Sequence, residues 1–269
     1  ASDNVGVGAN VLENTTTGQE NTGVGSNALN DNTTGKRNVA VGHQCLAANT
    51  TADNNVAVGR SCMSSNTTGH SNVAMGYFAL QQNSTGDQNT ALGINTLDAN
   101  TTGSNNTAVG RNALTSNTTA NLNTSVGYNS LRVNTTGTQL VAVGANALDA
   151  NTTANSNTAV GYDALKNNTT GDENTAIGMG CLDSNTTGQD NTGGGVSTLQ
   201  ANTTGDFNTG FGRGAIAFNT TANHNSGFGN KALFSNTTGA SNVAVGSSAL
   251  EQNTTGSDNT AVGMNALDA

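Results

Sequence analysis

Hydrophobic and small residues recur along the chain with a fixed period of seventeen. With Asn4 as position 1, the consensus reads N-T-A-V-G-x-x-A-L-x-x-N-T-T-G-x-x, with fifteen full repeats over residues 4–258 and a partial repeat over 259–269. Position 9 is Leu in every repeat except two, which carry Met63 and Ile216. No insertion or deletion disturbs the register. We therefore expect one continuous repeat array over residues 1–269.

The phrase N-T-A-V-G predicts a short strand in each repeat. Thr and Val are frequent in it, and alternation places positions 2 and 4 on one face and position 3 on the other. Seventeen residues are too few for two helices and a turn. We therefore expect an all-β fold: a parallel β-solenoid (β-roll) with 17 residues per coil and about 16 coils. Equivalent residues would stack about 4.8 Å apart.

The apolar pattern suggests which positions face inward. We expect the Val of position 4, as in Val41 and Val160, to form a core column with the Leu of position 9 and the small residue of position 8. Gly194 breaks the Val column and Phe211 and Phe228 follow in it, as if bulk lost in one coil were replaced by the next. The small residues of position 3 would then face outward and pack against a neighbouring chain.

Position 5 is Gly in every repeat, which indicates a positive φ or a very close backbone approach. Position 15, in contrast, accepts Ala in four repeats. We place a structural corner at Gly8, Gly25, Gly42, Gly59, Gly76, Gly93, Gly110, Gly127, Gly144, Gly161, Gly178, Gly195, Gly212, Gly229, Gly246 and Gly263.

Charge sharpens this division of inside from outside. The 8 Lys and Arg and 17 Asp and Glu all fall at positions 6, 7, 10, 11, 16 or 17. The net charge of −9 argues against nucleic acid as a partner. No run of 18 apolar residues occurs, so we expect no membrane insertion.

Candidate chemistry is sparse. His43, His70 and His224 are isolated substitutions at three different positions, and carboxylates that share a position are a whole coil apart. We predict no catalytic residue, no metal site, no cofactor and no enzymatic activity. Cys45, Cys62 and Cys181 all occupy position 8, where a small buried side chain is expected, although the spacing of the first two would also permit a disulfide.

The "NTT" phrase allows two interpretations. Its Asn and Thr can bond the backbone of a turn and stack as ladders. It is also an N-x-[ST] sequon, which predicts a column of glycans on an extracellular rod. The candidate N-glycosylation sites are Asn14, Asn32, Asn49, Asn66, Asn83, Asn100, Asn117, Asn134, Asn151, Asn168, Asn185, Asn202, Asn219, Asn236 and Asn253.

Two further surface features have competing interpretations. Phe207, Phe218 and Phe234 occupy outward positions and form a candidate partner patch, with local packing as the alternative. Stacked Thr at positions 2, 13 and 14 would offer a flat hydroxyl and methyl array, which favours an ice-binding solenoid as an alternative function. Val at position 2 in several repeats argues for inward packing there instead.

In its phrases "NTAVG", "NAL" and "NTTG", the chain resembles the NTAxGxxAL-xxNTTG repeat shafts of phage tail-fibre and bacterial surface proteins that often end in an endosialidase-type chaperone domain. It is more distantly similar to trimeric autotransporter adhesin heads, whose repeat is fourteen residues long. The resemblance implies a left-handed β-roll and a homotrimer.

These observations together predict a structural protein. We expect a fibre or stalk segment that gives length, rigidity and a periodic surface, on the outside of a cell or virion. Its expected partners are copies of itself (as a trimer, end to end, or both), covalent glycans and a cell-surface receptor. Neither terminus carries a polar capping repeat, so we expect an array that is uncapped at both ends.

Overall fold

The structure is a computed structural model that describes residues 1–268. The chain forms two compact units, Ala1–Thr138 and Gln139–Ala269. The last residue of the second unit, Ala269, lies outside the described residues. Each unit is a β-solenoid in which every coil contributes one three-residue strand. No helix occurs in residues 1–268, which confirms the predicted fold class.

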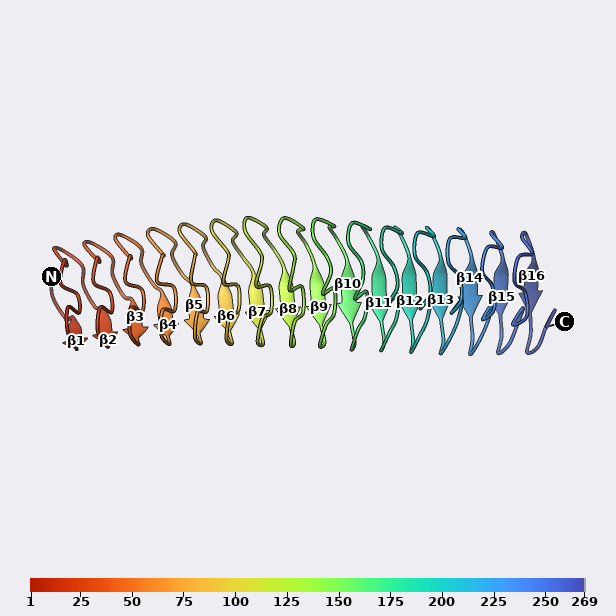
Figure 1. Cartoon of the computed structure of the whole chain (residues 1–269), viewed down its shortest axis with the longest axis horizontal. Helices are drawn as coiled ribbons and strands as arrows, with labels where there is room; N and C mark the ends of the chain where they lie inside the picture. The colour runs from red at the N-terminus through yellow and green to blue at the C-terminus, as the bar shows by residue number, and fades with distance from the viewer. Residues whose placement is uncertain (269) are drawn as a thin grey trace. The chain divides into compact units, whose positions relative to one another are not determined.

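In the first unit, consecutive strands pair in parallel, and each residue lies opposite the residue seventeen places on, as in the pair Val39 and Val56. Figure 1 shows these strands side by side in chain order. The strands are β1 (Val5–Val7), β2 (Thr22–Val24), β3 (Val39–Val41), β4 (Val56–Val58), β5 (Val73–Met75), β6 (Thr90–Leu92), β7 (Thr107–Val109) and β8 (Thr124–Val126).

The second unit repeats this arrangement with the same register, as in the pair Thr158 and Thr175. Its strands are β9 (Val141–Val143), β10 (Thr158–Val160), β11 (Thr175–Ile177), β12 (Thr192–Gly194), β13 (Thr209–Phe211), β14 (Ser226–Phe228), β15 (Val243–Val245) and β16 (Thr260–Val262).

The core of each coil is narrow and lined by small residues. Position 9 is buried as predicted, with Leu97 and Leu114 both 0% exposed, and so is position 8, as in Ala113. Position 3 is also buried: Ala40 and Ala57 are 0% exposed. The coil interior therefore consists of positions 3, 8 and 9, with buried Asn side chains beside them.

The predicted facing of the strand is wrong. We expected positions 2 and 4 inside and position 3 outside, but Val41 and Val160 of position 4 are exposed, as are Phe211 and Phe228. The reason is space. A Cβ on Gly210, at position 3, would lie 2.7 Å from Cγ2 of Thr198 in the preceding coil. In a close-packed interior, only a small side chain fits there.

The turns use left-handed backbone at non-glycine residues. Leu97 and Leu114 have φ of 53° and 54°, and residues at positions 7 and 17 of nearly every coil share this conformation. A left-handed conformation costs roughly 1–2 kcal/mol for such a residue, whereas fully burying a Leu side chain contributes about 1.5–3 kcal/mol. Burial of the Leu side chain therefore offsets the strain of its backbone.

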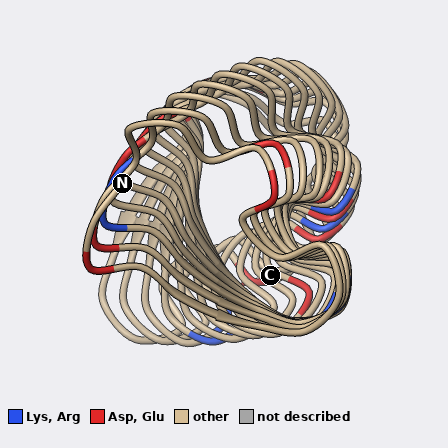
Figure 2. Ribbon diagram, turned by 90° about the vertical axis from the view of Figure 1, so that its left-hand side faces the viewer, with Lys and Arg blue, Asp and Glu red and all other residues tan. Residues whose placement is uncertain are grey.

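Charged side chains lie on the turns of the coil and not on the strands. Viewed along each solenoid, the Lys, Arg, Asp and Glu residues occupy separate stretches of the coil outline (Figure 2). This agrees with their restriction to six positions of the repeat. The strand side of the coil is thus left uncharged.

Candidate interaction surface

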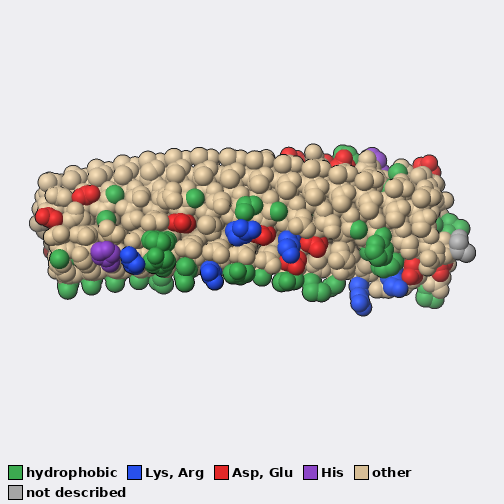
Figure 3. Space-filling model, in the orientation of Figure 1, with side chains coloured by type: hydrophobic (Ala, Val, Ile, Leu, Met, Phe, Trp, Pro, Cys, Tyr) green, Lys and Arg blue, Asp and Glu red, His purple; other side chains and the backbone are tan. Residues whose placement is uncertain are grey.

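The outer face of the sheet is formed by the side chains of positions 2 and 4. Met75, Ile177 and Phe211, all at position 4, are 52%, 51% and 45% exposed. Position 2 carries Thr or Val in nearly every strand, and its side chain is half-buried or exposed throughout. Figure 3 shows hydrophobic side chains lined up from coil to coil along the lower edge of the view, where the strands end. We call positions 2 and 4 of the strands the sheet face.

The sheet face contains a local exchange of bulk in the second unit. A Cβ on Gly194 would lie 2.5 Å from the ring of Phe211, so this ring covers the place where a Val side chain lies in other coils. Phe211 in turn stacks on Phe228 with ring centroids 5.9 Å apart. The predicted contact between successive coils therefore exists, but it lies on the outside of the sheet and not in the core.

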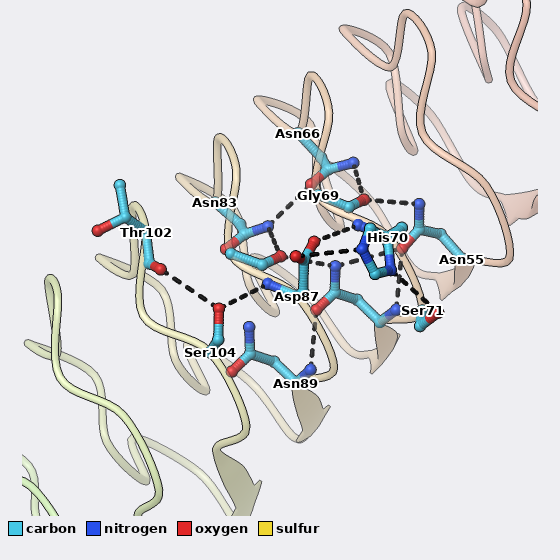
Figure 4. A network of polar contacts seen from close by, with 12 residues as sticks. Asn55, Asn66, Gly69, His70, Ser71, Asn83, Asp87, Asn89, Thr102 and Ser104 are labelled. Carbon is cyan, nitrogen blue, oxygen red and sulfur yellow. Dashed lines mark hydrogen bonds and ion pairs between the residues drawn. The ribbon is translucent and has the colours of Figure 1, made fainter.

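Another part of the coil, which we call the asparagine side, is held by the buried asparagines of positions 1 and 12. Nδ2 of Asn83 donates to Oδ1 of Asn66 at 2.8 Å and also to the carbonyl of Gly86 at 2.9 Å. Asn55, at position 1, donates through Nδ2 to the carbonyl of Gly69, so two ladders share the same turn carbonyls. Figure 4 shows how these contacts pass from coil to coil.

This geometry separates the two interpretations of the "NTT" phrase. The thirteen predicted sequon asparagines from Asn32 to Asn236 are 0% exposed. Buried polar groups are normally hydrogen-bonded, and a glycan on such an Nδ2 would displace its hydrogen bonds. The structure therefore favours the ladder at these positions. Asn14 is exposed and Asn253 is partly exposed, so an attached glycan would meet less obstruction there.

Two exposed N-x-[ST] sequons are not among the predicted glycosylation sites. Asn105, followed by Asn106 and Thr107, is exposed at position 17, and Asn167 is exposed at position 11 and is followed by Asn168 and Thr169. Both lie outside the "NTT" column. A search for N-x-[ST] without reference to the repeat frame would have found them.

A third polar ladder, at position 16, was also missed. The backbone N–H of His70 donates to Oδ1 of Asp87 at 2.8 Å, and the N–H of Asp87 donates to Oγ of Ser104 at 3.0 Å. Nε2 of His70 lies 3.2 Å from Oδ2 of the same Asp87 (Figure 4). Asp, Asn and Ser are frequent at position 16. These residue types could have predicted the ladder, because their short side chains carry an oxygen that accepts a backbone hydrogen bond.

Every position-5 glycine has a positive φ, between 121° and 143°. At Gly110 a Cβ would overlap the carbonyl oxygen of Gly127 in the next coil, and at Gly161 it would lie 2.6 Å from that of Gly178. Both reasons considered for an invariant glycine therefore apply together. The chain turns at this point directly after each strand.

The cysteines lie in the core. Cys45, Cys62 and Cys181 are free thiols and 0% exposed, so no disulfide joins the first two. The adjacent Cys45 thiol and burial together raise the pKa of Cys62 above its ordinary value. Burial raises the pKa of Cys181 to about 12. The thiols of Cys62 and Cys181 therefore stay protonated, and all three cysteines pack as small buried side chains.

The three phenylalanines of the predicted partner patch do not form one cluster of rings. Phe207 stacks on His224 with centroids 5.0 Å apart. Phe218 and Phe234 meet edge to face at 4.9 Å. Phe234 also lines a surface hollow of about 350 Å³ together with Ser197, Gln200, Arg213, Gly214, Asn230 and Lys231.

Among the described residues, no group of three or more His, Cys, Asp or Glu side chains is placed to hold a metal ion. No helix within residues 1–268 is long and apolar enough to cross a membrane. A scan against protein-family models finds no match to this chain, and a search of curated proteins finds none either. Function is therefore inferred from the geometry of the coil.

Proposed function

We propose that this chain is a shaft segment of an extracellular fibre, in which copies of the solenoid associate through their sheet faces. The sheet face is the observation that carries the proposal. Its position-4 side chains are apolar and largely exposed, its position-2 side chains are Thr, Ser or Val, and no charged residue occurs at positions 1–5 of any coil. The repeated, self-complementary ladders give the coil its rigidity.

The size of the sheet face supports association. Eight strands about 4.8 Å apart, each about 10 Å long, present on the order of 400 Å² in each unit. The largest apolar patch of a typical monomer is about 300–600 Å² and is often a functional site. Each sheet face is therefore as large as such a patch, and a partner that covered it would remove its apolar side chains from water.

The pairing of Gly194 with Phe211 points the same way. The Phe211 ring takes up the space of the side chain that Gly194 lacks, so neighbouring coils share the available room on this face. A face whose bulk is balanced between coils suits close packing against a partner. A homotrimer is the proposed assembly, because the resemblance to tail-fibre shafts and adhesin heads implies it; the cell or virion surface is the proposed location.

Light scattering of the purified protein tests this proposal. We expect a mass near three times the 26.8 kDa chain. Val109→Glu, which places a charge on the sheet face, should shift the mass towards one chain. Ala99→Glu is the matched control, because it adds the same charge at position 11, where Asp31 occurs naturally. A single-chain mass for the unaltered protein at all concentrations would contradict the proposal.

One observation favours ice binding as a second candidate. Position 14 is Thr in all fifteen coils that reach it, and all fifteen side chains are exposed, whereas the exposed position 17 varies widely. Val at position 2 no longer argues against an outward Thr array, because that position faces outward. Thermal hysteresis of the protein, with Thr102→Lys and Thr119→Lys together as the disrupting variant, tests this candidate. A freezing point equal to the melting point would exclude it.

A further inference from the structure

A surface hollow beside Phe234 interrupts the otherwise regular surface of the second unit. It lies on the outside of the second unit, and its volume is about 350 Å³. Its lining comes from positions 6, 7 and 10 of three successive coils. None of these positions belongs to the sheet face, so an occupant of the hollow does not compete for the strands.

Missing side chains open the hollow. Position 7 carries Asn, Asp, Ser or a larger side chain in all coils except two, which carry Gly180 and Gly214. A Cβ on Gly214 would lie 3.2 Å from the ring of Phe234, which is tighter than an ordinary contact. A Cβ on Gly180 would lie 3.9 Å from both Oγ of Ser197 and Nε2 of Gln200. Gly214 thus leaves space within the hollow, whereas Gly180 leaves space on the far side of Ser197 and is not part of the lining.

The walls of the hollow differ in chemistry. Phe234 provides an apolar wall, and its ring is held by the edge-to-face contact with Phe218 at 4.9 Å. Ser197, Gln200 and Asn230 add a hydroxyl and two amides to the lining. Hydroxyl and amide groups both donate and accept hydrogen bonds. A ligand with an apolar face and several hydroxyl groups would match these walls.

The hollow is locally cationic in a chain of net charge −9. The Lys231 ammonium lies 3.2 Å from the Glu251 carboxylate and 5.3 Å from the centroid of the Phe234 ring. Arg213 is exposed and forms no ion pair with any residue among 1–268. One guanidinium is therefore available, and its planar fork suits a carboxylate better than an ammonium does.

We propose that this hollow binds a carboxylate-bearing sugar of the uronic acid type. Arg213 would pair with the carboxylate, the amides and the hydroxyl would bond the sugar hydroxyls, and Phe234 would contact the C–H face of the ring. The proposal goes beyond the shaft function and does not depend on self-association. It gives one segment of an otherwise uniform surface the capacity to recognise an acidic saccharide.

Titration with methyl glucuronide, followed by isothermal calorimetry or by amide chemical shifts, tests this proposal. We expect saturable binding of methyl glucuronide, and at least tenfold weaker binding of methyl glucoside, which has the same ring without the carboxylate. Arg213→Gln should weaken binding of the glucuronide at least tenfold. Arg111→Gln is the matched control, because it removes the same charge from the same position of a coil in the other unit.

A second variant separates shape from charge. Gly214→Asn installs the residue that Asn95 and Asn112 provide at position 7 with φ of 53° and 59°, so the backbone of Gly214, with φ of 65°, should accept it. It fills the hollow and should abolish binding. Its Cβ would lie 3.2 Å from the Phe234 ring, so the ring must shift slightly and the melting temperature should fall only a little. Unchanged affinity in Gly214→Asn, equal losses in the two Arg variants, no saturable binding, or inorganic phosphate binding as tightly as the glucuronide would overturn the proposal.

Discussion

The asparagine side of the coil and the sheet face differ in burial and in how much their residues vary. On the asparagine side, Asn100 is fully buried, and its amide bonds Asn83, Gly103 and Asn117. On the sheet face, Thr107 and Val109 are not buried, and equivalent residues range from Gly to Phe. Both sides belong to the same seventeen residues, so the contrast is one of environment.

The two parts of the coil also differ in where their packing and hydrogen-bond partners come from. Buried polar groups need partners of fixed geometry, and the next coil supplies them, so the asparagine side is complete within one chain. Within residues 1–268 no other part of the chain covers the sheet face, and it accepts side chains of any size that remain apolar or hydroxylated. We infer that its constraint comes from outside the chain, which is the basis of the proposed shaft assembly.

The largest effect is expected at the corner that directly follows each strand, at position 5. Gly110 has φ of 128°, and a Cβ there would overlap the backbone of Gly127. Gly110→Ala should therefore lower the free energy of unfolding by about 3 kcal/mol or more, because backbone strain and overlap add. Urea unfolding followed by circular dichroism measures the change.

Gly103→Ala is the control for that measurement. Gly103 also lies close to the next coil, but four other coils carry Ala at the same position, among them Ala52 and Ala120. Gly103→Ala should cost much less than Gly110→Ala. Equal losses of stability in the two variants would mean that positions 5 and 15 are equally constrained, which would contradict the assignment of the corner to position 5.

The asparagine ladder should show the next largest effect. Asn100→Ala leaves the buried Oδ1 of Asn83, the carbonyl of Gly103 and Nδ2 of Asn117 each short of a partner. Unsatisfied buried groups cost about 1–3 kcal/mol each, and partial relaxation should leave a net loss of about 2 kcal/mol. The urea midpoint should fall without a change in the slope of the transition.

Leu140 offers the reverse experiment. It replaces the position-1 Asn in one coil, and its side chain therefore presents no amide oxygen to the N–H of Asn157. In other coils that bond is present, as between the N–H of Asn174 and Oδ1 of Asn157 at 2.8 Å. Leu140→Asn should therefore raise stability or leave it unchanged. A clear loss would show that apolar burial at this position outweighs the ladder.

Part of this architecture could be predicted from the sequence. The period, the strand of each coil and the buried Leu of position 9 followed from the spacing of residues such as Leu97 and Leu114, because a stacked column repeats its environment. The facing of the strand could not be predicted from size and hydropathy. Val109 looked like core and Ala108 like surface, but only a small side chain fits inside so narrow a coil.

The hollow was only partly predictable for a related reason. Phe234 stood out in the sequence, but its neighbours come from three coils, and Gly214 contributes by an absent side chain. The left-handed Leu residues had no sequence signal either, since Leu rarely adopts this conformation. Turn geometry thus depends on how coils stack, which a single repeat does not display.

A smaller effect is expected at a buried carboxylate that lacks a hydrogen-bond partner. Oδ1 of Asp98 is buried and has no hydrogen-bond partner among the described residues. Burial raises the pKa of Asp98, so its charged form is disfavoured in the folded state. The stabilising contribution is fully present below the unfolded pKa of about 4 and is lost as the pH rises through the higher folded pKa.

Asp98→Asn should therefore stabilise the protein at pH 7, by less than about 1 kcal/mol because the group is only half buried and solvent screens it. The gain should shrink as the pH is lowered towards about 4. Thermal melts across this pH range measure it. Asp31→Asn, which removes the same charge from an exposed side chain, controls for net charge. A pH-independent gain would show that titration of Asp98 is not its cause.

The smallest effect is expected at Thr107, directly after the buried Asn106. The Thr107 side chain is exposed, and Val39 and Val56 occupy the same position in other coils. Thr107→Val should therefore change the free energy of unfolding by no more than about 0.5 kcal/mol, as is usual for a surface substitution. Urea unfolding measures the change.

Asn106→Val, one residue earlier, is the contrasting variant. It removes the bonds from Asn106 to Asn89 and to the carbonyl of Ala120. The loss of these buried hydrogen bonds should cost about 2 kcal/mol. A loss above about 1 kcal/mol in Thr107→Val, in contrast, would mean that the hydroxyl on the sheet face has a role of its own. That result would weaken the case for an apolar contact between copies and strengthen the case for ordered water on an array of threonines.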